Sequence, residues 1–283
     1  MLRPAIIPFL LFWPLAAGAA SQPEEGNQPF PPFRIIGDIY YVGASDIAAY
    51  LITTPAGDFL MNSGYEDTAP LIRNSIQSLG FRLSDVKILL NSQAHFDHVA
   101  GQAALQKWTG AKIYSSAADA GVLESGGKTD PRFGKEWTYP PVKVDHIVRD
   151  GEGVTLGGVT LVAHLTPGHT QGCTTWTMTV ADRSKRYDVV FVGGTSINPG
   201  VRLVRAPTYP GIAEDYATTF RVLRSLHCDI FLGAHGAYYG MQAKRERQKA
   251  GQGSSAFIDP QGYREYVDRA ERTYREALRR EEK

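Results

Sequence analysis

The chain has 283 residues, 43% of them hydrophobic, and its 30 basic and 29 acidic side chains leave a formal charge of only +1. This balance argues against nucleic acid as a partner, because such proteins usually carry a clustered excess of lysine and arginine. Cys173 and Cys228 are the two cysteines. They are too few for a disulfide scaffold, although they could pair with each other in an oxidising compartment.

Residues 1–20 predict a secretory signal peptide. Arg3 precedes an apolar stretch at 5–15, and the small residues at 17–19 form a cleavage signature. The apolar stretch contains two prolines and is too short to span a bilayer comfortably, so we expect no stable membrane anchor. The mature protein is therefore expected to be periplasmic, and we expect it to be a monomer.

Residues 21–33 contain four prolines among polar side chains and predict an extended N-terminal arm. One domain is expected to occupy residues 34–283, which is long enough to bury a deep core. Short runs rich in β-branched and aromatic residues at 34–43, 46–55 and 57–64 predict a meander of strands.

The hydrophobic period then changes and predicts a βαβ unit. Residues 68–80 have apolar side chains on one helical face and end at glycine, as an amphipathic helix does. Residues 86–90 form a run that is apolar except for Lys87 and predicts a strand covered on both faces. A helix at about 98–108 and a strand at 111–116 follow, so the polar residues 91–97 lie at the carboxyl end of a central strand.

The second half repeats this plan after an irregular, glycine-rich stretch at 124–141, in which Trp137 and Tyr139 could wall a cleft. Predicted in order are strands at 158–167, 174–180 and 187–194, a helix at 212–226, a strand at 228–235 and two terminal helices. Two similar halves of this kind predict an α/β fold in which two face-to-face sheets lie between outer helices, an αββα four-layer sandwich.

Four of the seven histidines lie in loops that end apolar strands, beside glycines that let the backbone approach an ion. One loop contains Gln93, His95, Asp97 and His98, and the others contain His169 and His235. Imidazole and carboxylate are the ligands that zinc favours, and the side chains of the first loop can point to two sides. This pattern predicts two adjacent metal ions. A single histidine such as His169 or His235 would by itself more often be structural, as we expect for His146, His164 and His227.

The sequence resembles the metallo-β-lactamase superfamily, and within it subclass B3. The resemblance lies in "QAHFDHVAG" at 93–101 and "LTPGHTQGCTTWTMT" at 165–179, and it extends over "AYLITTPAGDFLMNSG" and "EDYATTFRVLRSLHCDIFLGAHG". It implies the αββα fold. It also implies one zinc ion on Gln93, His95 and His169, and a second on Asp97, His98 and His235.

The resemblance further implies hydrolysis of the β-lactam amide bond of penicillins, cephalosporins and carbapenems by a metal-bound hydroxide, which confers antibiotic resistance. Asp97 is the implied catalytic residue, because it would orient that hydroxide. The loop after the second motif would contact the substrate through Thr195, Ser196 and Asn198, although these residues could equally be ordinary turn residues. Thr170 is a candidate for orienting a ligand.

Three departures from the superfamily pattern refine this hypothesis. Gln93 replaces the usual histidine, as in the GOB-type branch of subclass B3, and its neutral carboxamide should bind metal more weakly. Residues 191–200 contain no bridging aspartate, which favours subclass B3 over glyoxalase-type hydrolases. Val201 stands where the family often has a tyrosine. The alternative function is an exported metallo-hydrolase that acts on lactones or thioesters.

Overall fold

Two β-sheets lie face to face at the centre of the structure, a computed structural model that describes residues 26–283. The first sheet has seven strands in sequence order: β1 (Phe33–Ile36), β2 (Ile39–Tyr41), β3 (Tyr50–Ile52), β4 (Asp58–Met61), β5 (Val86–Leu90), β6 (Lys112–Ser116) and β7 (His146–Val148). The second sheet has five strands in the order β12 (Ile230–Gly233), β11 (Lys185–Val192), β10 (Thr174–Asp182), β9 (Val159–Leu165) and β8 (Gly153–Leu156).

Both sheets change from antiparallel to parallel pairing, and this change places the loops. Strands β1 to β4 form an antiparallel meander, whereas β4, β5, β6 and β7 are parallel. In the second sheet, β8 to β11 are antiparallel and β11 pairs in parallel with β12. Parallel strands require crossover connections and deliver their following loops to one edge of the sheet.

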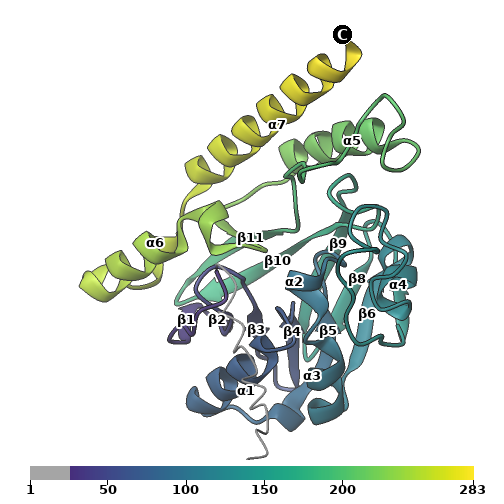
Figure 1. The fold of residues 1–283 in the computed structure, drawn as a ribbon. Helices are drawn as coiled ribbons and strands as arrows, with labels where there is room; N and C mark the ends of the chain where they lie inside the picture. Colours follow the sequence, from purple (N-terminus) through teal and green to yellow (C-terminus); the bar gives the residue numbers. More distant parts are fainter. Residues whose placement is uncertain (1–25) are drawn as a thin grey trace, which may run out of the picture.

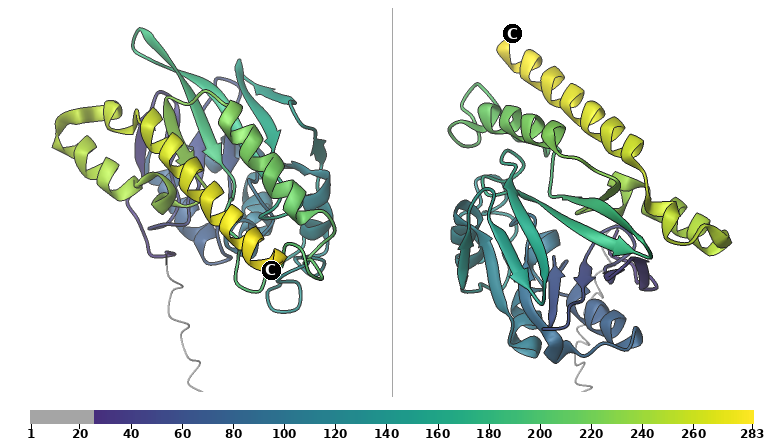
Figure 2. Two further views of the ribbon diagram at one scale, coloured as in Figure 1. Left: turned by 90° about the horizontal axis from the view of Figure 1, so that it is seen from above. Right: turned by 180° about the vertical axis from the view of Figure 1, so that it is seen from behind.

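Helices cover the outer faces of both sheets, as Figures 1 and 2 show. On the side of the first sheet lie α1 (Thr68–Ser78), α2 (Phe96–Val99), α3 (Gln102–Thr109) and α4 (Ala117–Glu124). On the side of the second sheet, α5 (Ile212–Ser225) and α7 (Pro260–Glu282) lie next to each other, and α6 (Met241–Arg247) follows β12. Single turns complete the chain: η1 (Leu83–Asp85), η2 (Gly236–Tyr239), η3 (Gln248–Gln252) and η4 (Gly253–Phe257). The predicted αββα sandwich is confirmed.

The hydrophobic core has one part between the sheets and another beneath the helices of the first sheet. Trp176 on β10 and Phe191 on β11 are buried between the sheets together with Tyr50 on β3. Along β10, buried side chains alternate with more exposed ones, which is the period-two pattern of a strand with one face in the core. Ile72 and Ile76 of α1 belong to the other part of the core.

The structure differs from the sequence prediction around two short helices. The predicted helix at 98–108 is two helices, α2 and α3, separated at Ala100 and Gly101. The chain must be close to the preceding loop there, because a Cβ on Gly101 would lie 2.5 Å from the carbonyl oxygen of Ser63. Helix α4 and strands β7 and β8 were not predicted, and α4 consists largely of small residues without a clear apolar period.

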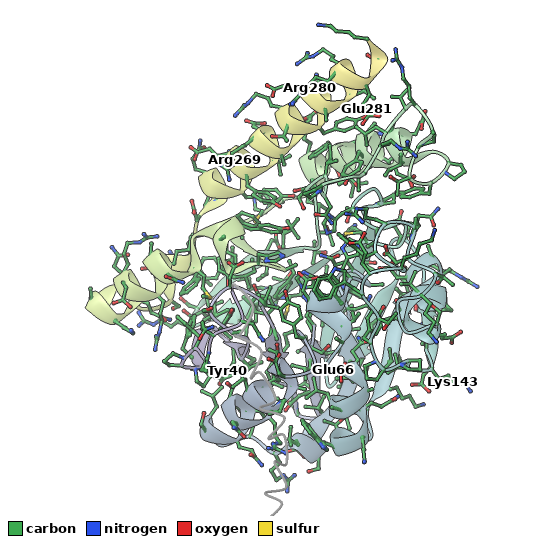
Figure 3. The ribbon with its side chains drawn as sticks, viewed as in Figure 1. Tyr40, Glu66, Lys143, Arg269, Arg280 and Glu281 are labelled. Carbon is green, nitrogen blue, oxygen red and sulfur yellow. The ribbon has the colours of Figure 1, made fainter. Side chains whose placement is uncertain are left out.

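Helix α7 confirms the predicted charged terminal helix and is amphipathic. Tyr263, Tyr266 and Tyr274 are buried against the second sheet and α5. The charged side chains of Arg269 and Arg280 extend outward from the helix in Figure 3. A buried aromatic face of this kind explains why a helix so rich in charge still packs on the domain.

The N-terminal arm is described from residue 26 onward, and the predicted signal peptide lies outside the described residues. Asn27 is buried, and its amide nitrogen donates a hydrogen bond of 2.7 Å to the carboxylate of Asp67 at the start of α1. Among the described residues, Cys173 and Cys228 are both buried and free. Within residues 26–283, no helix is long and apolar enough to cross a membrane.

Candidate metal centre

Three loops that carry predicted ligands meet at one edge of the sandwich. The loop after β5 is held by Asn62, whose side-chain oxygen accepts a hydrogen bond of 2.9 Å from the backbone N–H of Ser92. Asn62 has a positive φ of 63°, a conformation that asparagine tolerates better than most residues. The carbonyl oxygen of Ser92 accepts a 2.8 Å hydrogen bond from the N–H of Thr174, and Trp176 donates to the carbonyl of Asn91. The loop is therefore fixed to both sheets.

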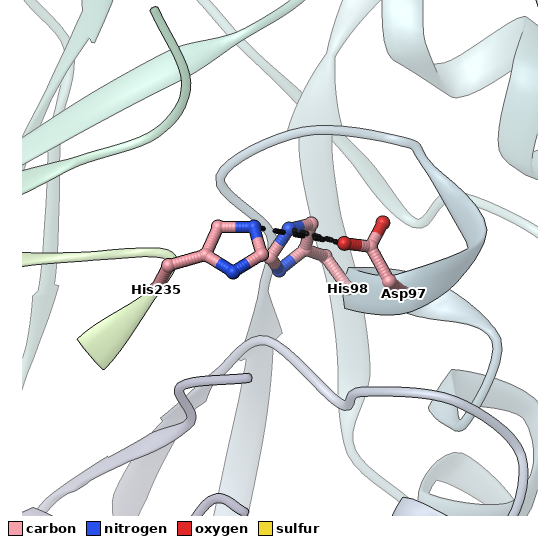
Figure 4. Close-up of side chains that lie close together, drawn as sticks. All are labelled: Asp97, His98 and His235. Carbon is pink, nitrogen blue, oxygen red and sulfur yellow. Dashed lines mark ion pairs between the residues drawn. The ribbon is translucent and has the colours of Figure 1, made fainter. Parts of the chain in front are cut away.

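Asp97, His98 and His235 form one compact group of possible ligands (Figure 4). Oδ2 of Asp97 lies 3.1 Å from Nε2 of His98 and 3.6 Å from Nε2 of His235. His98 is fully buried, whereas the other two side chains are partly exposed. The ligand atoms of the group lie within 4.8 Å of one another, so one cation can contact them all.

His95 and His169 lie next to each other beside this group, and Gln93 precedes His95 by two positions in the same loop. Nδ1 of His95 lies 3.2 Å from Nε2 of His169, and the two rings meet edge to face. Gln93 is 1% exposed, and neither atom of its amide has a hydrogen-bond partner among the described residues. A buried amide without partners is costly, so the position fits a group that accepts a lone pair from the amide oxygen. A metal ion is such a group.

The outward-facing nitrogens of three histidines are held by oxygen atoms. Nδ1 of His235 lies 2.9 Å from the carboxylate of Asp46, and Nδ1 of His169 lies 2.7 Å from the carbonyl oxygen of Ser196. Nε2 of His95 lies 3.5 Å from the carboxylate of Asp130. An oxygen acceptor on one ring nitrogen places the proton there and leaves the other nitrogen free as a ligand. The free nitrogens are those that face each other or Asp97.

Burial and charge set the protonation of the group as metal ligation requires. Burial lowers the pKa of His169 to about 4 and, helped by His169, lowers the pKa of His95 well below its usual value. Burial alone would raise the pKa of Asp97, but His98 and His235 outweigh that effect and lower it below its usual value. At neutral pH His95 and His169 are neutral and Asp97 is ionised, which is the state that binds a cation.

A cavity of about 220 Å³ opens beside the predicted ligands. Two members of each group line it, His95 and His169 from one and Asp97 and His235 from the other, together with Phe96, Phe133, Ser196 and Asn198. A larger groove of about 640 Å³ lies between α5 and α7, but its lining contains none of the predicted site residues. The smaller cavity is therefore the candidate binding site, because predicted site residues line it.

The predicted substrate contacts divide into two kinds. Ser196 and Asn198 line the cavity. Thr195 is buried, and its hydroxyl is 2.7 Å from the hydroxyl of Tyr266 on α7, so this hydroxyl faces the helix layer. Tyr139, expected as a cleft wall, is buried and donates a hydrogen bond of 2.8 Å to the carbonyl of Ala94. Ser196 and Asn198 remain candidates for substrate contact.

Aromatic rings form one side of the cavity. Trp137 stacks on Phe96 with 4.5 Å between ring centroids and 12° between planes, and Phe133 packs edge-on against Phe96 and His95. Trp137 is 42% exposed, so one face of this cluster is available to a ligand. Phe96 and Phe133 line the cavity, and a contribution of Trp137 to the wall of the cleft stays a prediction.

The other three histidines lie elsewhere. Nε2 of His146 pairs with Glu152 at 2.5 Å, and Nε2 of His164 lies 2.9 Å from the hydroxyl of Thr177. His227 pairs with Asp188 at 2.9 Å in an exposed cluster. Exposed acidic groups of this kind are common without a metal ion, and we assign the cluster no function.

Sequence reasoning missed three aspartates around the site: Asp46, Asp119 and Asp130. Asp46 and Asp130 face histidines that are predicted ligands, and Asp119 accepts hydrogen bonds from the loop that follows His169. None of them lies in the motifs that drew attention. The sequence Ser116-Ala117-Ala118-Asp119 has the spacing of a helix-capping box and could have indicated both α4 and the unusual aspartate in its first turn.

Comparisons with known proteins agree with this geometry. The profile described as "Metallo-beta-lactamase superfamily" matches residues 42–235. The native FEZ-1 metallo-beta-lactamase from Legionella gormanii is 46% identical, with a TM-score of 0.88 over 90% of this chain and 98% of that chain. BJP-1, a subclass B3 metallo-beta-lactamase of Bradyrhizobium japonicum, is 39% identical, with a TM-score of 0.85 over 91% and 97% of the two chains.

The metallo-beta-lactamase GOB-18 from Elizabethkingia meningoseptica is 36% identical, with a TM-score of 0.86 over 92% of this chain and 96% of that chain. Matches to curated proteins are partial. A probable metallo-hydrolase of Burkholderia pseudomallei is 28% identical over 153 residues, which are 53% of this chain and 51% of that protein. The chain thus spans about half the length of that curated relative, whereas it covers nearly all of the three solved structures.

Proposed function

Because this chain belongs to the metallo-beta-lactamase superfamily, we propose that it hydrolyses the β-lactam amide bond with zinc bound by two adjacent groups of side chains. Gln93, His95 and His169 would hold one ion. Asp97, His98 and His235 would hold the other. The observation that carries the proposal is that one cavity is lined by His95 and His169 of the first group and by Asp97 and His235 of the second, in a fold shared over nearly full length with subclass B3 metallo-beta-lactamases.

The donor set suits zinc, which favours imidazole nitrogen and carboxylate oxygen over the all-oxygen sites of calcium and magnesium. Zinc in such a site lowers the pKa of water to about 7 and polarises a carbonyl group. Since Gln93 offers a neutral amide oxygen, we expect weaker binding at the first group than at the second. One zinc ion per chain at low metal concentration and two at high concentration follow from this difference.

The protein's own residues have distinct tasks in this proposal. Asp97 stays ionised because its pKa is lowered, so it can accept a hydrogen bond from the attacking water and orient it toward the carbonyl carbon. A carboxylate with so low a pKa is a poor store for a proton, which makes orientation its main task. Asp46 and Ser196 hold the rings of His235 and His169 and fix which nitrogen is free.

The mouth of the cavity would bind the rest of the substrate. Ser196 and Asn198 are polar residues on its lining and are the candidates to bind the substrate carboxylate. The ring of Trp137, stacked on Phe96, offers an apolar surface to a substituent of the substrate. This division, with polar groups on one loop and aromatic groups on another, is typical of small-molecule sites.

We also propose that the protein is exported to the periplasm and acts as a monomer. The N-terminal sequence supports export, because a positive residue, a short apolar stretch and small residues follow in the order of a signal peptide. Sequencing the N-terminus of the protein recovered from a periplasmic extract would test the cleavage near residue 20.

The test of function is hydrolysis of a chromogenic cephalosporin by the zinc-loaded mature protein. We expect activity that a chelator abolishes and added zinc restores. His235→Ala should remove it, whereas His146→Ala, which changes an exposed histidine paired with Glu152, should leave it intact. Activity that is absent with zinc, or that persists with chelator, would contradict the proposal. A parallel panel of acyl lactones and glutathione thioesters decides between β-lactamase and the alternative hydrolases.

A further inference from the structure

Asp119 is a buried carboxyl group at the junction of two loops that carry predicted ligands. It is 1% exposed and lies in the first turn of α4, where its backbone N–H donates to the hydroxyl of Ser116, the N-cap. In a capping box an acidic side chain at this position turns back toward the cap. The carboxylate of Asp119 instead extends toward the loops.

Its oxygens accept two hydrogen bonds from one of these loops and face the other. Oδ1 accepts from the backbone N–H of Gly172 at 3.1 Å, and Oδ2 accepts from the hydroxyl of Thr170 at 3.2 Å. The backbone N–H of Ala94, in the other loop, lies close enough to the same carboxylate to lower its pKa. Ala94 lies between Gln93 and His95 in the sequence, and Thr170 directly follows His169. One carboxylate therefore joins the segments that carry all three donors of the first group.

The surrounding contacts restrict movement of the same segments. The carbonyl of Ala94 accepts a hydrogen bond of 2.8 Å from Tyr139, so its peptide group is held on both sides. Ser116 donates a 2.7 Å hydrogen bond to the carbonyl of Gly172. A Cβ on Gly172 would lie 2.2 Å from the hydroxyl oxygen of Ser116 and 2.6 Å from Cγ of Asp119, so only glycine fits there.

Burial at this position is unfavourable for an ionised acidic side chain. Burial raises the pKa of Asp119 to about 7, against the hydrogen bonds from Thr170 and Gly172 that lower it. Capping of α4 alone does not account for a carboxylate here, since Ser116 already caps the helix. The contacts of the carboxylate with two separate loops account for its presence at this position.

We propose that Asp119 is a positioning residue that sets the spacing of Gln93, His95 and His169, and so controls metal affinity at the first group and not at the second. The inference rests on the ligand sets of the proposed function. The second group depends on a different carboxylate, Asp46, which is bonded to His235. The two affinities should therefore be separable by mutation.

Zinc titration of the metal-free mature protein, followed by competition with a chromogenic chelator, tests this inference without any activity measurement. His169→Ala and His235→Ala identify which binding step belongs to which group. Asp119→Asn, which keeps the shape of the side chain, should weaken the step that His169→Ala abolishes by about 10- to 100-fold, the usual effect of losing a residue that orients ligands. The step that His235→Ala abolishes should change by less than about twofold.

Asp58→Asn is the matched control, because Asp58 is also buried with a raised pKa but lies at the start of β4. It should leave both zinc steps unchanged. Thr170→Val, which removes one hydrogen bond, should weaken the same step as Asp119→Asn. This variant decides the matter if near-UV circular dichroism shows that Asp119→Asn does not fold.

Two negative results would have different meanings. If neither histidine variant removes a zinc step from the wild-type pattern, the ligand sets of the proposed function are wrong. If the steps are assigned but Asp119→Asn and Thr170→Val leave the first-group affinity unchanged, or weaken both groups equally, the positioning role is wrong.

Discussion

Replacing Gln93 by methionine should stabilise the metal-free protein and remove zinc binding at the first group. Gln93 is 1% exposed and its two amide atoms have no partner among the described residues. Each unsatisfied buried polar atom costs about 1–3 kcal/mol, so the two together set an upper bound of about 6 kcal/mol. A water molecule in the folded protein and imperfect repacking would reduce this, and we expect a gain of about 1–3 kcal/mol.

The chain offers a close control in Gln102, on α3. It is also 1% exposed and also has both amide atoms without partners among residues 26–283. Gln102→Met should stabilise the protein by a similar amount, but it should leave both zinc steps intact. The comparison separates the general cost of a buried amide from the particular use of the amide at Gln93.

Urea unfolding with and without zinc measures the effect. In chelator, both variants should unfold at higher urea than the wild type, and their melting temperatures should rise by about 2–4 °C for each kcal/mol gained. With excess zinc, the wild type and Gln102→Met should gain more stability than Gln93→Met, which keeps only the second group. The reasoning would be refuted if metal-free Gln93→Met were less stable than the wild type, or if zinc stabilised the two variants equally.

Four further predictions concern the same cavity. Gln93→His should tighten zinc at the first group, because imidazole is the stronger ligand, and an unchanged titration would argue against Gln93 as a donor. Asp46→Asn should weaken zinc binding at the second group by about 10- to 100-fold and leave binding at the first group unchanged; equal weakening of both groups would contradict the separate grouping. In the folded protein the pKa of His169 is lowered to about 4, so the unfolded chain binds more protons than the folded one between about pH 6.5 and 4. The metal-free protein therefore loses about 3 kcal/mol of stability as the pH falls through that window. His169→Asn should flatten that part of the pH profile of unfolding, and an equally steep profile would show that the titration belongs to other groups. Trp137→Ala should raise KM roughly 2- to 12-fold for substrates with aromatic substituents and leave kcat nearly unchanged, since the ring gives about 0.5–1.5 kcal/mol of binding remote from the reacting bond; a fall in kcat alone would place Trp137 in the reaction itself.

Gln93 and Asp119 both lower the stability of the metal-free protein. The buried amide of Gln93 has no hydrogen-bond partner among the described residues, and burial raises the pKa of the Asp119 carboxyl group to about 7. Both features are unfavourable in the metal-free fold. Gln93 belongs to the first group of predicted ligands, and Asp119 lies beside that group. Zinc bound there as proposed would recover part of the stability that the metal-free fold loses.

The sequence by itself determined the layers of the fold and the residues that meet at the site. The run at 86–90, apolar except for Lys87, could be assigned to a central strand because a strand buried on both faces has few polar positions. Glycine-flanked histidines at strand ends pointed to one edge, since parallel strands deliver their following loops there. Those local signals require no knowledge of distant parts of the chain.

Tertiary structure alone decided which side chains hold the ligands in place and which way others point. Thr195 was expected at the substrate, yet its hydroxyl meets Tyr266 of α7, 71 positions along the chain. Asp46 reaches His235 across 189 positions. Asp119 joins loops that lie on two different sheets. Contacts of this kind leave no periodic trace in the sequence, because they depend on how the two halves pack and not on the local period of a helix or strand.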